Sequence, residues 1–437
     1  MRALWRRLLL LLPAGLAIVG MWLVMRWCIG NTMAEYAPDQ EAARQAVQLA
    51  PADPTSHHTL AALDDQSLLP EEMPEALRQY EQAVRLSPHD YRLWMDLGRA
   101  YEEAGDTQKS EQALRHATQL APAYALPHWY LGNVLLRQGR PEEAFAELRR
   151  ASDEDPTLRP QAFNMAWHVY NKNTDAVIAA IGRSAPARAQ LIEYLIGQKK
   201  LDDTLRLWSS FSAGERREQH EAGEKLMAAL FGAHRYHTVL DIYNDLALSE
   251  TAKLSVGELL NGGFEDNIGP AGRSYFDWQV LPIAQAQISI DAGTSHTGTR
   301  SLRISFAAAS PLEFHNVSQF VVVEPGARYR LQYYVRTEDL KSASTLITEV
   351  LDGAGPSSAV LAASAPLPAG THDWQPETLN FTTPLQSDGI TIRLSRAPCQ
   401  AAACPIFGKV WYDDFDLQRT GSASDARGGS GAQSLRH

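Results

Sequence analysis

The stretch that decides the fold of this chain is YRLWMDLGRAYEEAGDTQKSEQALRHATQLAP, residues 91–122. Its first half carries bulky apolar side chains at helical spacing: Trp94, Leu97 and Tyr101. These side chains form one face of a predicted first helix. Gly98 lies on the same face and lets a second helix approach closely, and Pro122 stops that second helix. The stretch therefore predicts a helical hairpin.

The hairpin pattern recurs in both directions along the chain with a period of 34 residues. The following copy has Leu131, Gly132, Leu135, Ala144, Leu148, Ala151 and Pro156, and the preceding copy has Leu63, Ala76, Tyr80, Ala83 and Pro88. One hairpin cannot cover its own apolar face, so consecutive hairpins must stack. With this period and these prolines the segment resembles the tetratricopeptide repeat family, over about residues 39–246 when weaker copies are included.

Weaker copies flank the clear ones. A capping half-repeat precedes them, formed by Ala42, Ala43, Ala46, Leu49 and Pro51. The step from Ala46 to Ala83 exceeds the period by three residues, which predicts a lengthened turn at 64–70. Beyond Pro156 helical spacing continues less regularly through Met165, Ala166, Val169, Leu191, Leu195, Thr204, Trp208, Phe211, Leu226, Met227, Leu230, Val239, Tyr243 and Leu246. We therefore predict an α-solenoid over residues 31–246.

The resemblance implies a concave groove, formed by the first helix of each pair, that holds peptide segments or partner domains. Four aromatic residues on predicted first helices are candidates for contacting a protein partner: Trp129, Tyr130, Trp167 and Tyr170. For Trp129 and Trp167, burial in the core is an equally good interpretation. The sequence does not identify the partner.

Length and composition limit the class of protein. The 437 residues exceed what one core accommodates, so two or three domains are expected. A formal net charge of -11, with no basic patch beyond the N-terminus, argues against nucleic acid as a partner. The sequence contains no nucleophile elbow, phosphate-binding glycine loop, dinucleotide fingerprint or zinc motif. We therefore expect no enzymatic activity and no required cofactor.

The N-terminus carries a predicted transmembrane helix. Three arginines precede an uncharged apolar run from Leu8 to Met25, which is long enough to cross a bilayer. Only Arg26 follows the run closely, so the positive-inside rule leaves the N-terminus in the cytoplasm and places the later residues in the periplasm. The alternative is a cleaved signal peptide, but the run is longer than a usual signal core and lacks a small-residue cleavage site. Residues 1–30 are therefore expected to form a single-pass anchor in the inner membrane.

After a predicted linker at 247–258, the chain changes to short alternating runs that predict strands. They are 287–290, 301–306, 317–323, 329–336, 345–351, 377–381, 391–394 and 409–417. Eight strands at this spacing favour an antiparallel jelly-roll sandwich over residues 259–419. Residues 420–437 are rich in Gly, Ser and Ala and are expected to be a disordered tail. The predicted class is therefore multidomain, α + β.

Several motifs follow one another in order through the β segment. They are Leu260-Asn261-Gly262-Gly263-Phe264-Glu265, Trp278, His296-Thr297-Gly298-Thr299-Arg300-Ser301-Leu302, Pro325-Gly326 before Tyr329, Trp374, Phe381 and Val410-Trp411-Tyr412-Asp413-Asp414-Phe415. In this order they resemble carbohydrate-binding modules of the galactose-binding-like jelly-roll type. Sugars bind exposed aromatic faces, and the candidate carbohydrate-binding residues are Tyr275, Phe276, Phe314, His315, Tyr333 and Tyr334. Many domains with this fold bind no sugar, so the fold alone does not decide whether this domain binds one.

The same resemblance implies a structural calcium ion that ties the first strand to the last. Glu265 from the opening motif and Asp413 or Asp414 from the closing motif match its carboxylate ligands. A pair of surface aspartates without a metal is an equally good interpretation. Separately, Cys399 and Cys404 enclose four residues and would close a small disulfide ring in an oxidising compartment.

Together these features predict a membrane-anchored periplasmic scaffold. The solenoid would bind protein partners and the sandwich would bind a polysaccharide, in envelope polysaccharide synthesis or export or in cell-wall organisation. The alternative is a scaffold for protein interactions alone, without sugar binding. A glycan-processing enzyme would need a carboxylate pair in an aromatic cleft, and the sequence offers no obvious pair.

Overall fold

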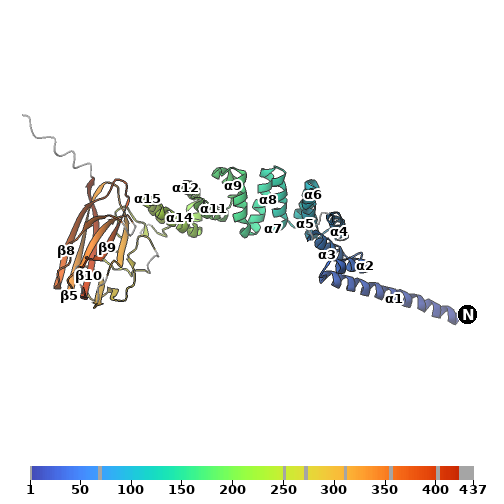
Figure 1. Cartoon of the computed structure of the whole chain (residues 1–437), viewed down its shortest axis with the longest axis horizontal. Helices are drawn as coiled ribbons and strands as arrows, with labels where there is room; N and C mark the ends of the chain where they lie inside the picture. Colours follow the sequence, from blue (N-terminus) through green and yellow to red (C-terminus); the bar gives the residue numbers. More distant parts are fainter. Residues whose placement is uncertain are drawn as a thin grey trace, which may run out of the picture. The chain divides into compact units, whose positions relative to one another are not determined.

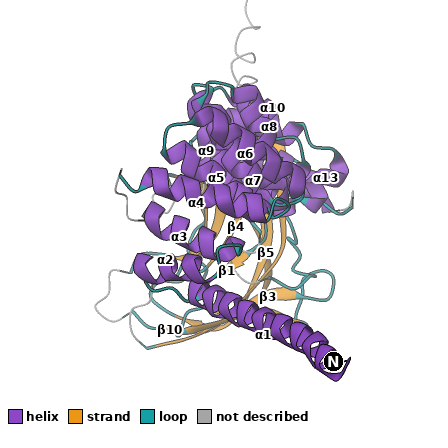
Figure 2. Cartoon of the chain, turned by 90° about the vertical axis from the view of Figure 1, so that its right-hand side faces the viewer, coloured by secondary structure: helices purple, strands orange, loops and turns teal. Residues whose placement is uncertain are grey.

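The computed structural model describes residues 2–66, 71–249, 252–269, 274–309, 313–353, 358–399 and 404–422. By its internal contacts the chain divides into two compact units, Met1–Ser210 and Phe211–His437. Helices occupy the first part of the chain and strands the second (Figure 1 and Figure 2). The predicted class, multidomain α + β, is confirmed.

The first unit is helical. Its elements are α1 Arg2–Glu35, α2 Gln40–Leu49, α3 Pro54–Gln66, α4 Met73–Leu86, α5 Tyr91–Glu103, α6 Thr107–Leu120, α7 Ala125–Arg137, α8 Pro141–Glu154, the 3-10 turn η1 Pro156–Leu158, α9 Arg159–Val169, α10 Thr174–Ile181, α11 Ala185–Gly197 and α12 Leu201–Ser209. Contacts are densest within the pairs α3/α4, α5/α6 and α7/α8. Helices α5 and α7 begin at Tyr91 and Ala125, one predicted period apart, so the repeating hairpin is confirmed.

At three junctions between helix pairs, a proline follows the second helix and also anchors the next first helix. Its carbonyl oxygen accepts a hydrogen bond from a ring N–H six residues further along the chain. The bonds run from Trp94 Nε1 to Pro88 (2.9 Å), from His128 Nε2 to Pro122 (3.0 Å) and from His57 Nε2 to Pro51 (3.0 Å). The sequence pattern assigns Trp94 to packing alone. In the structure its ring N–H also donates a hydrogen bond to a carbonyl group just beyond the end of the preceding helix.

The turns inside the hairpins require a residue with left-handed backbone. Gly105 and Gly139 supply it in the regular repeats, with φ of 81° and 73°. Later repeats place Lys172, Lys199 and His234 there, with φ of 62°, 58° and 58°. A non-glycine residue in this conformation costs about 1–2 kcal/mol, which the packing of the hairpin must offset. The sequence pattern therefore fades after α8 while the hairpins continue.

Helix α1 continues past the apolar run into the solenoid. The segment Pro13–Glu35 is long and apolar enough to cross a membrane. The last turns of α1 pack on α2 and α3 (Figure 1). A Cβ on Gly30 would lie 2.6 Å from the Cβ of Ala50, and Asn31 Nδ2 donates to both carboxylate oxygens of Asp53 at 3.3 Å. The end of α1 is thus the first helix of the capping half-repeat, and α2 is the second.

The second unit contains two five-stranded antiparallel sheets. Its strands are β1 Gln279–Val280, β2 Ala286–Asp291, β3 Ser301–Ala308, β4 Val317–Val322, β5 Ala327–Lys341, β6 Leu346–Asp352, β7 Val360–Ala363, β8 Gly370–Thr382, β9 Gly389–Arg396 and β10 Ile406–Ser422. Sheet A has the order β1-β4-β9-β6-β7, and sheet B has the order β2-β3-β10-β5-β8. All eight predicted strands are present, and the predicted sandwich is confirmed. The sequence pattern does not predict β1 and β7, the short edge strands of sheet A.

The expected tail needs one correction. Ser422 pairs with Ala327, so residues 420–422 extend β10 instead of beginning a disordered segment. This pairing gives the end of β10 backbone partners on β5. Residues 423–437 lie outside the described part of the chain, as do 67–70 of the predicted lengthened turn.

Three further helices belong to the second unit: α13 Ala213–Glu218, α14 His220–Gly232 and α15 Tyr236–Leu246. The α14–α15 hairpin packs on the outer face of sheet A through aromatic rings. The ring centroid of Phe320 on β4 lies 5.0 Å from Phe231 and 4.6 Å from Tyr236. Asp388, just before β9, accepts hydrogen bonds from the backbone and ring of His237. The sequence pattern assigns these helices to a solenoid at 31–246, whereas their contacts group them with the sandwich.

The close contact between paired helices gives a test of the repeat. We expect Gly98→Ala to lower the free energy of unfolding by about 1–3 kcal/mol, because its Cβ would lie 2.6 Å from Cγ of Leu114. Urea denaturation of the whole chain in detergent, followed by far-UV circular dichroism, measures the change. The matched control is Gly197→Ala, where no atom lies within 4 Å and stability should stay equal or rise. Equal stability of the two variants would contradict the proposed helix contact.

Candidate functional site

The outer face of sheet A carries the main candidate site. On β9, Ile390, Ile392 and Leu394 point into the core, so the alternate residues Thr391, Arg393 and Ser395 lie on the outer face. Strand pairing places Ser318 of β4 and Glu349 of β6 on either side of Arg393. Polar side chains from three strands therefore meet in one row across the sheet.

Glu349, at one end of this row, is the acceptor that joins its neighbours. Its Oε2 accepts hydrogen bonds from Arg393 Nε at 3.1 Å, Arg393 Nη2 at 2.8 Å and Ser395 Oγ at 2.6 Å. The three side chains line a cavity of about 630 Å³ together with His315 and Glu313. A carboxylate and a guanidinium held side by side offer an acceptor and several donors, which suits a ligand rich in hydroxyl groups.

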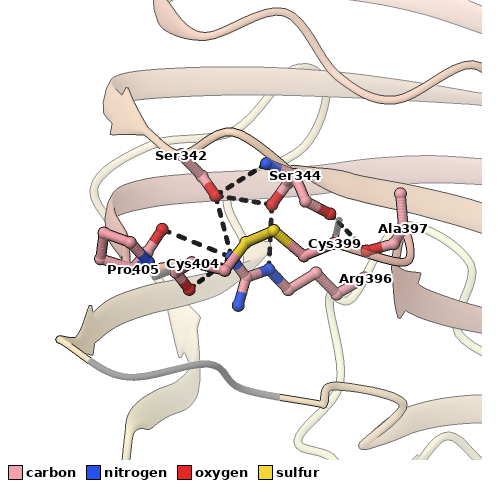
Figure 3. The surroundings of a disulfide bond; sticks show 7 residues. All are labelled: Ser342, Ser344, Arg396, Ala397, Cys399, Cys404 and Pro405. Carbon is pink, nitrogen blue, oxygen red and sulfur yellow. Dashed lines mark hydrogen bonds between the residues drawn. A yellow bond between two sulfur atoms is a disulfide. The ribbon is translucent and has the colours of Figure 1, made fainter. Parts of the chain in front are cut away.

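A disulfide joins Cys399 to Cys404 (Figure 3). Both cysteines line this cavity. Arg396 lies beneath the disulfide, with the guanidinium donating to the carbonyl oxygens of Ser344 (2.9 Å) and Cys404 (2.9 Å) and to Ser342 Oγ (2.9 Å). Burial lowers the pKa of Arg396. The guanidinium thus ties the disulfide loop to the end of β5 and to β9.

The predicted carbohydrate-binding residues divide between several places. Tyr275 lines a second cavity, of about 710 Å³, on the same face of sheet A. Phe314 and His315 line the cavity beside Glu349, although Phe314 is buried. Tyr334 lies on sheet B, where its ring stacks on His296 with centroids 3.6 Å apart. Phe276 is also buried, with 4% of its surface exposed. Tyr333 is wholly buried in the core, so its ring has no face available to a sugar.

The three predicted calcium ligands bind the loop at residues 296–300. Asp413 accepts the backbone N–H of His296 at 2.7 Å, and Asp414 accepts the Thr297 hydroxyl at 2.6 Å. Glu265 accepts the backbone N–H groups of Thr299 (2.7 Å) and Arg300 (3.1 Å). The acids thus join the first and last parts of the sandwich through hydrogen bonds.

The contacts of these acids give no support to the expected calcium ion. Calcium would bind the carboxylate oxygens, whereas backbone N–H groups and two threonine hydroxyls donate hydrogen bonds to those oxygens here. Within the described residues no group of three or more acidic, His or Cys side chains is arranged to hold a metal. The Thr299 hydroxyl lowers the pKa of Glu265, while burial raises the pKa of Asp413 to about 6. The calcium stays a prediction that a titration decides.

The predicted protein-binding residues of the solenoid do not form one cluster. Tyr130 lies under the guanidinium of Arg99, 5.1 Å from its ring centroid, and Trp129 is half-buried beside it in the chain. Tyr170 packs on Phe145 of α8, with ring centroids 5.3 Å apart. Trp167 is 3% exposed and packs against Tyr194 of α11. Trp129, Tyr130 and Tyr170 are therefore partly exposed, whereas Trp167 is buried.

The stacked hairpins and the paired sheets define a repeat scaffold joined to a β-sandwich. Residues 72–125 and 111–158 match the tetratricopeptide repeat family, so this part of the chain consists of tetratricopeptide repeats. The repeats make the chain a scaffold for protein–protein interaction.

Several solved structures are similar to parts of the chain. A CBM4 carbohydrate-binding module is 16% identical, with a TM-score of 0.28, covering 37% of this chain and 100% of its own. A family 16 carbohydrate-binding module is 16% identical, with a TM-score of 0.26, covering 37% and 98%. Pseudomonas aeruginosa pilF is 16% identical, with a TM-score of 0.30, covering 43% and 89%. Every TM-score is below 0.5, so nothing about ligands follows. Among curated proteins no relative was found.

Sequence reasoning misses Glu349, Arg393 and Ser395 as site residues. The predicted strands 345–351 and 391–394 contain the first two as polar residues alternating with apolar ones, which is a usable signal. The pairing of β6 with β9 brings Glu349 and Arg393 together, although 44 residues separate them in the sequence. That pairing is not visible in the sequence alone.

The hydrogen-bonded carboxylates lead to an expectation about calcium. We expect the melting temperature of the sandwich to change by less than about 1 °C between millimolar calcium and excess EGTA, because no binding energy would be linked to folding. Tryptophan fluorescence of the whole chain in detergent measures it.

The variant Glu265→Gln provides the matched comparison. It should lower the melting temperature equally in calcium and in EGTA, since Thr299 and Arg300 lose a charged acceptor in both conditions. A rise of several degrees with calcium in the unchanged protein, lost in the variant, would instead establish the metal site.

Proposed function

We propose that this chain is a membrane-anchored scaffold that holds a protein partner on its repeats and binds a glycan on its sandwich. Its place would be in envelope polysaccharide synthesis or export, or in cell-wall organisation. The observation that supports glycan binding is the Glu349–Arg393–Ser395 group at the wall of a cavity of about 630 Å³. Sugar hydroxyls both donate and accept, so they pair with such a group more completely than an apolar ligand would.

Three further features support the proposal. The repeats supply a surface for a protein partner, and Trp129 and Tyr130 are the residues we propose for that contact. The apolar helix α1 supports a single membrane span. The disulfide supports a periplasmic position, because such bonds persist in oxidising compartments.

The second candidate is a scaffold for protein interactions without sugar binding. The aromatic packing of α14–α15 on Phe320 favours it, because a sheet face that binds helices need not bind a glycan. The two candidates differ in whether the sandwich retains any polysaccharide.

The glycan half of the proposal predicts a defect in Glu349→Gln. We expect this variant to bind polysaccharide about tenfold more weakly, because the amide loses the charge that organises Arg393 and Ser395. Affinity electrophoresis of the full chain in detergent, in gels containing hydroxyethylcellulose, xylan, alginate or peptidoglycan, measures retention. The control is Glu338→Gln, whose carboxylate pairs with Lys409 on sheet B.

Three outcomes are possible in this experiment. Loss of retention in Glu349→Gln but not in Glu338→Gln supports the proposed site. Equal retention in both variants overturns the Glu349 cavity as the binding site. No retention of the unchanged protein on any of the four polymers leaves the protein-interaction scaffold as the function.

The proposed topology predicts the redox state of the cysteines in cells. Alkylation of the denatured, unreduced chain with a large maleimide should modify only Cys28, because Cys399 and Cys404 form a disulfide in the periplasm. Reduction before alkylation should then modify all three cysteines. Modification of all three without a reductant would place the sandwich in the cytosol and overturn the proposed orientation.

A further inference from the structure

The α14–α15 hairpin closes one end of the outer face of sheet A. Phe231 of α14 stacks on Tyr275 with ring centroids 4.5 Å apart, and its edge meets Phe320 of β4. Strand β9 begins beside this contact, at Gly389. A Cβ added to Gly389 would lie 2.7 Å from the ring of Tyr236 on α15. Nothing larger than glycine fits there, so helix and sheet are in direct contact.

Beside this contact lies the cavity of about 710 Å³, lined by both the hairpin and the sheet. Phe231 and Tyr243 reach it from the helices, and Tyr275, Ser318 and Thr391 reach it from the sandwich. Within the part of the chain that the structure describes, Ser318 Oγ and the hydroxyls of Tyr243 and Tyr275 form no hydrogen bond to protein. The cavity thus combines aromatic rings with available hydroxyl groups.

The charge of the lining restricts the ligand. Glu224 is its one ionisable carboxylate among the described residues, and no Lys, Arg or His of that part of the chain lines the cavity. An anionic ligand would meet a negative charge without a positive partner, so it is disfavoured. Aromatic rings pack on the C–H face of a pyranose, and hydroxyl groups pair with its hydroxyls. A neutral hexopyranose fits this combination.

The two cavities share one sheet face. Thr391 lines the cavity beside the hairpin, and the next outward residues of β9, Arg393 and Ser395, line the other. Ser318 of the first cavity is paired with Arg393 of the second. A ligand that starts between Tyr275 and Tyr243 can therefore extend towards Glu349, but the hairpin blocks extension in the opposite direction.

We propose that the α14–α15 hairpin makes the sandwich a binder of glycan chain ends, with the terminal neutral hexopyranose held in the 710 Å³ cavity. This inference rests on the proposed function, because the following sugar units would reach the Glu349–Arg393 group. An open sheet face would accept an internal stretch of polysaccharide, whereas a face closed at one end accepts only a terminus.

Calorimetry on the full chain, in a detergent without a sugar headgroup, tests the inference. The probes are cellotetraose, chitotetraose, the methyl glycosides of glucose, galactose and N-acetylglucosamine, and the anionic tetragalacturonate. We expect a neutral tetrasaccharide to bind, a methyl glycoside to compete with it because the terminal subsite binds a single sugar unit, and tetragalacturonate not to bind.

The variants separate this cavity from the neighbouring one. Tyr275→Ala should weaken tetrasaccharide binding about tenfold by removing the aromatic ring. Tyr243→Phe and Ser318→Ala, which each remove one hydroxyl and keep the packing, should weaken it about fivefold. Tyr124→Ala, at an exposed tyrosine of the first unit, should leave the affinity unchanged.

Each contrary result has a distinct meaning. Unchanged binding in the three cavity variants, with loss in Glu349→Gln, overturns the chain-end inference and leaves the proposed function standing. The same conclusion follows if polysaccharide retains the protein but no methyl glycoside competes with a tetrasaccharide. If neither polymers nor oligosaccharides bind the unchanged protein, the inference and the glycan half of the proposed function both fail.

Discussion

The close approach of the two helices in each hairpin is the constraint on which the first unit depends. Gly98 and Gly132 have no side chain where Leu114 and Leu148 of the partner helix need room. Because the helices touch this closely, each pair exposes one continuous apolar face, which only the next pair can cover. Stacking is therefore a consequence of a missing Cβ in each regular repeat.

A second close contact of the same kind joins helix and sheet. At Gly389 an added side chain would meet Tyr236 and Phe320, so the sheet face admits the α14–α15 hairpin only because β9 starts with glycine. The aromatic rings of Phe231 and Tyr275 then complete the contact. A helix pair of the repeat type thus serves as a wall of the sandwich, and it lines a cavity that the strands alone would not form.

Features with a local cause could be read from the sequence. The 34-residue spacing of small residues and prolines predicted the hairpins, and alternation predicted eight strands. The edge strand β1 was not predicted because two residues are too few to establish a period, and β7 was not predicted because its four residues are all apolar and show no alternation. The grouping of α14–α15 with the sandwich was not predicted for another reason. A helix that packs on a sheet and a helix that packs on a helix show the same spacing of apolar residues.

The candidate site was only partly accessible to sequence reasoning. Tyr275, Phe314 and His315 were predicted from residue type and do lie at the two cavities, but the same reasoning also selected the buried Tyr333. Glu349 and Arg393 meet because β6 pairs with β9 in one register, and a slip of either strand by one residue would turn that strand's side chain to the core. Residue type alone cannot supply that register.

The unbroken course of α1 has a mechanical consequence. From Pro13 to Glu35 the helix has no turn or loop, and Gly30 and Asn31 fasten its end to α2 and α3. If the helix spans a bilayer as proposed, any tilt of the span, for example in a thinner membrane, rotates the first repeat by the same angle. The thickness of the bilayer would then set the angle at which the repeats project from the membrane surface.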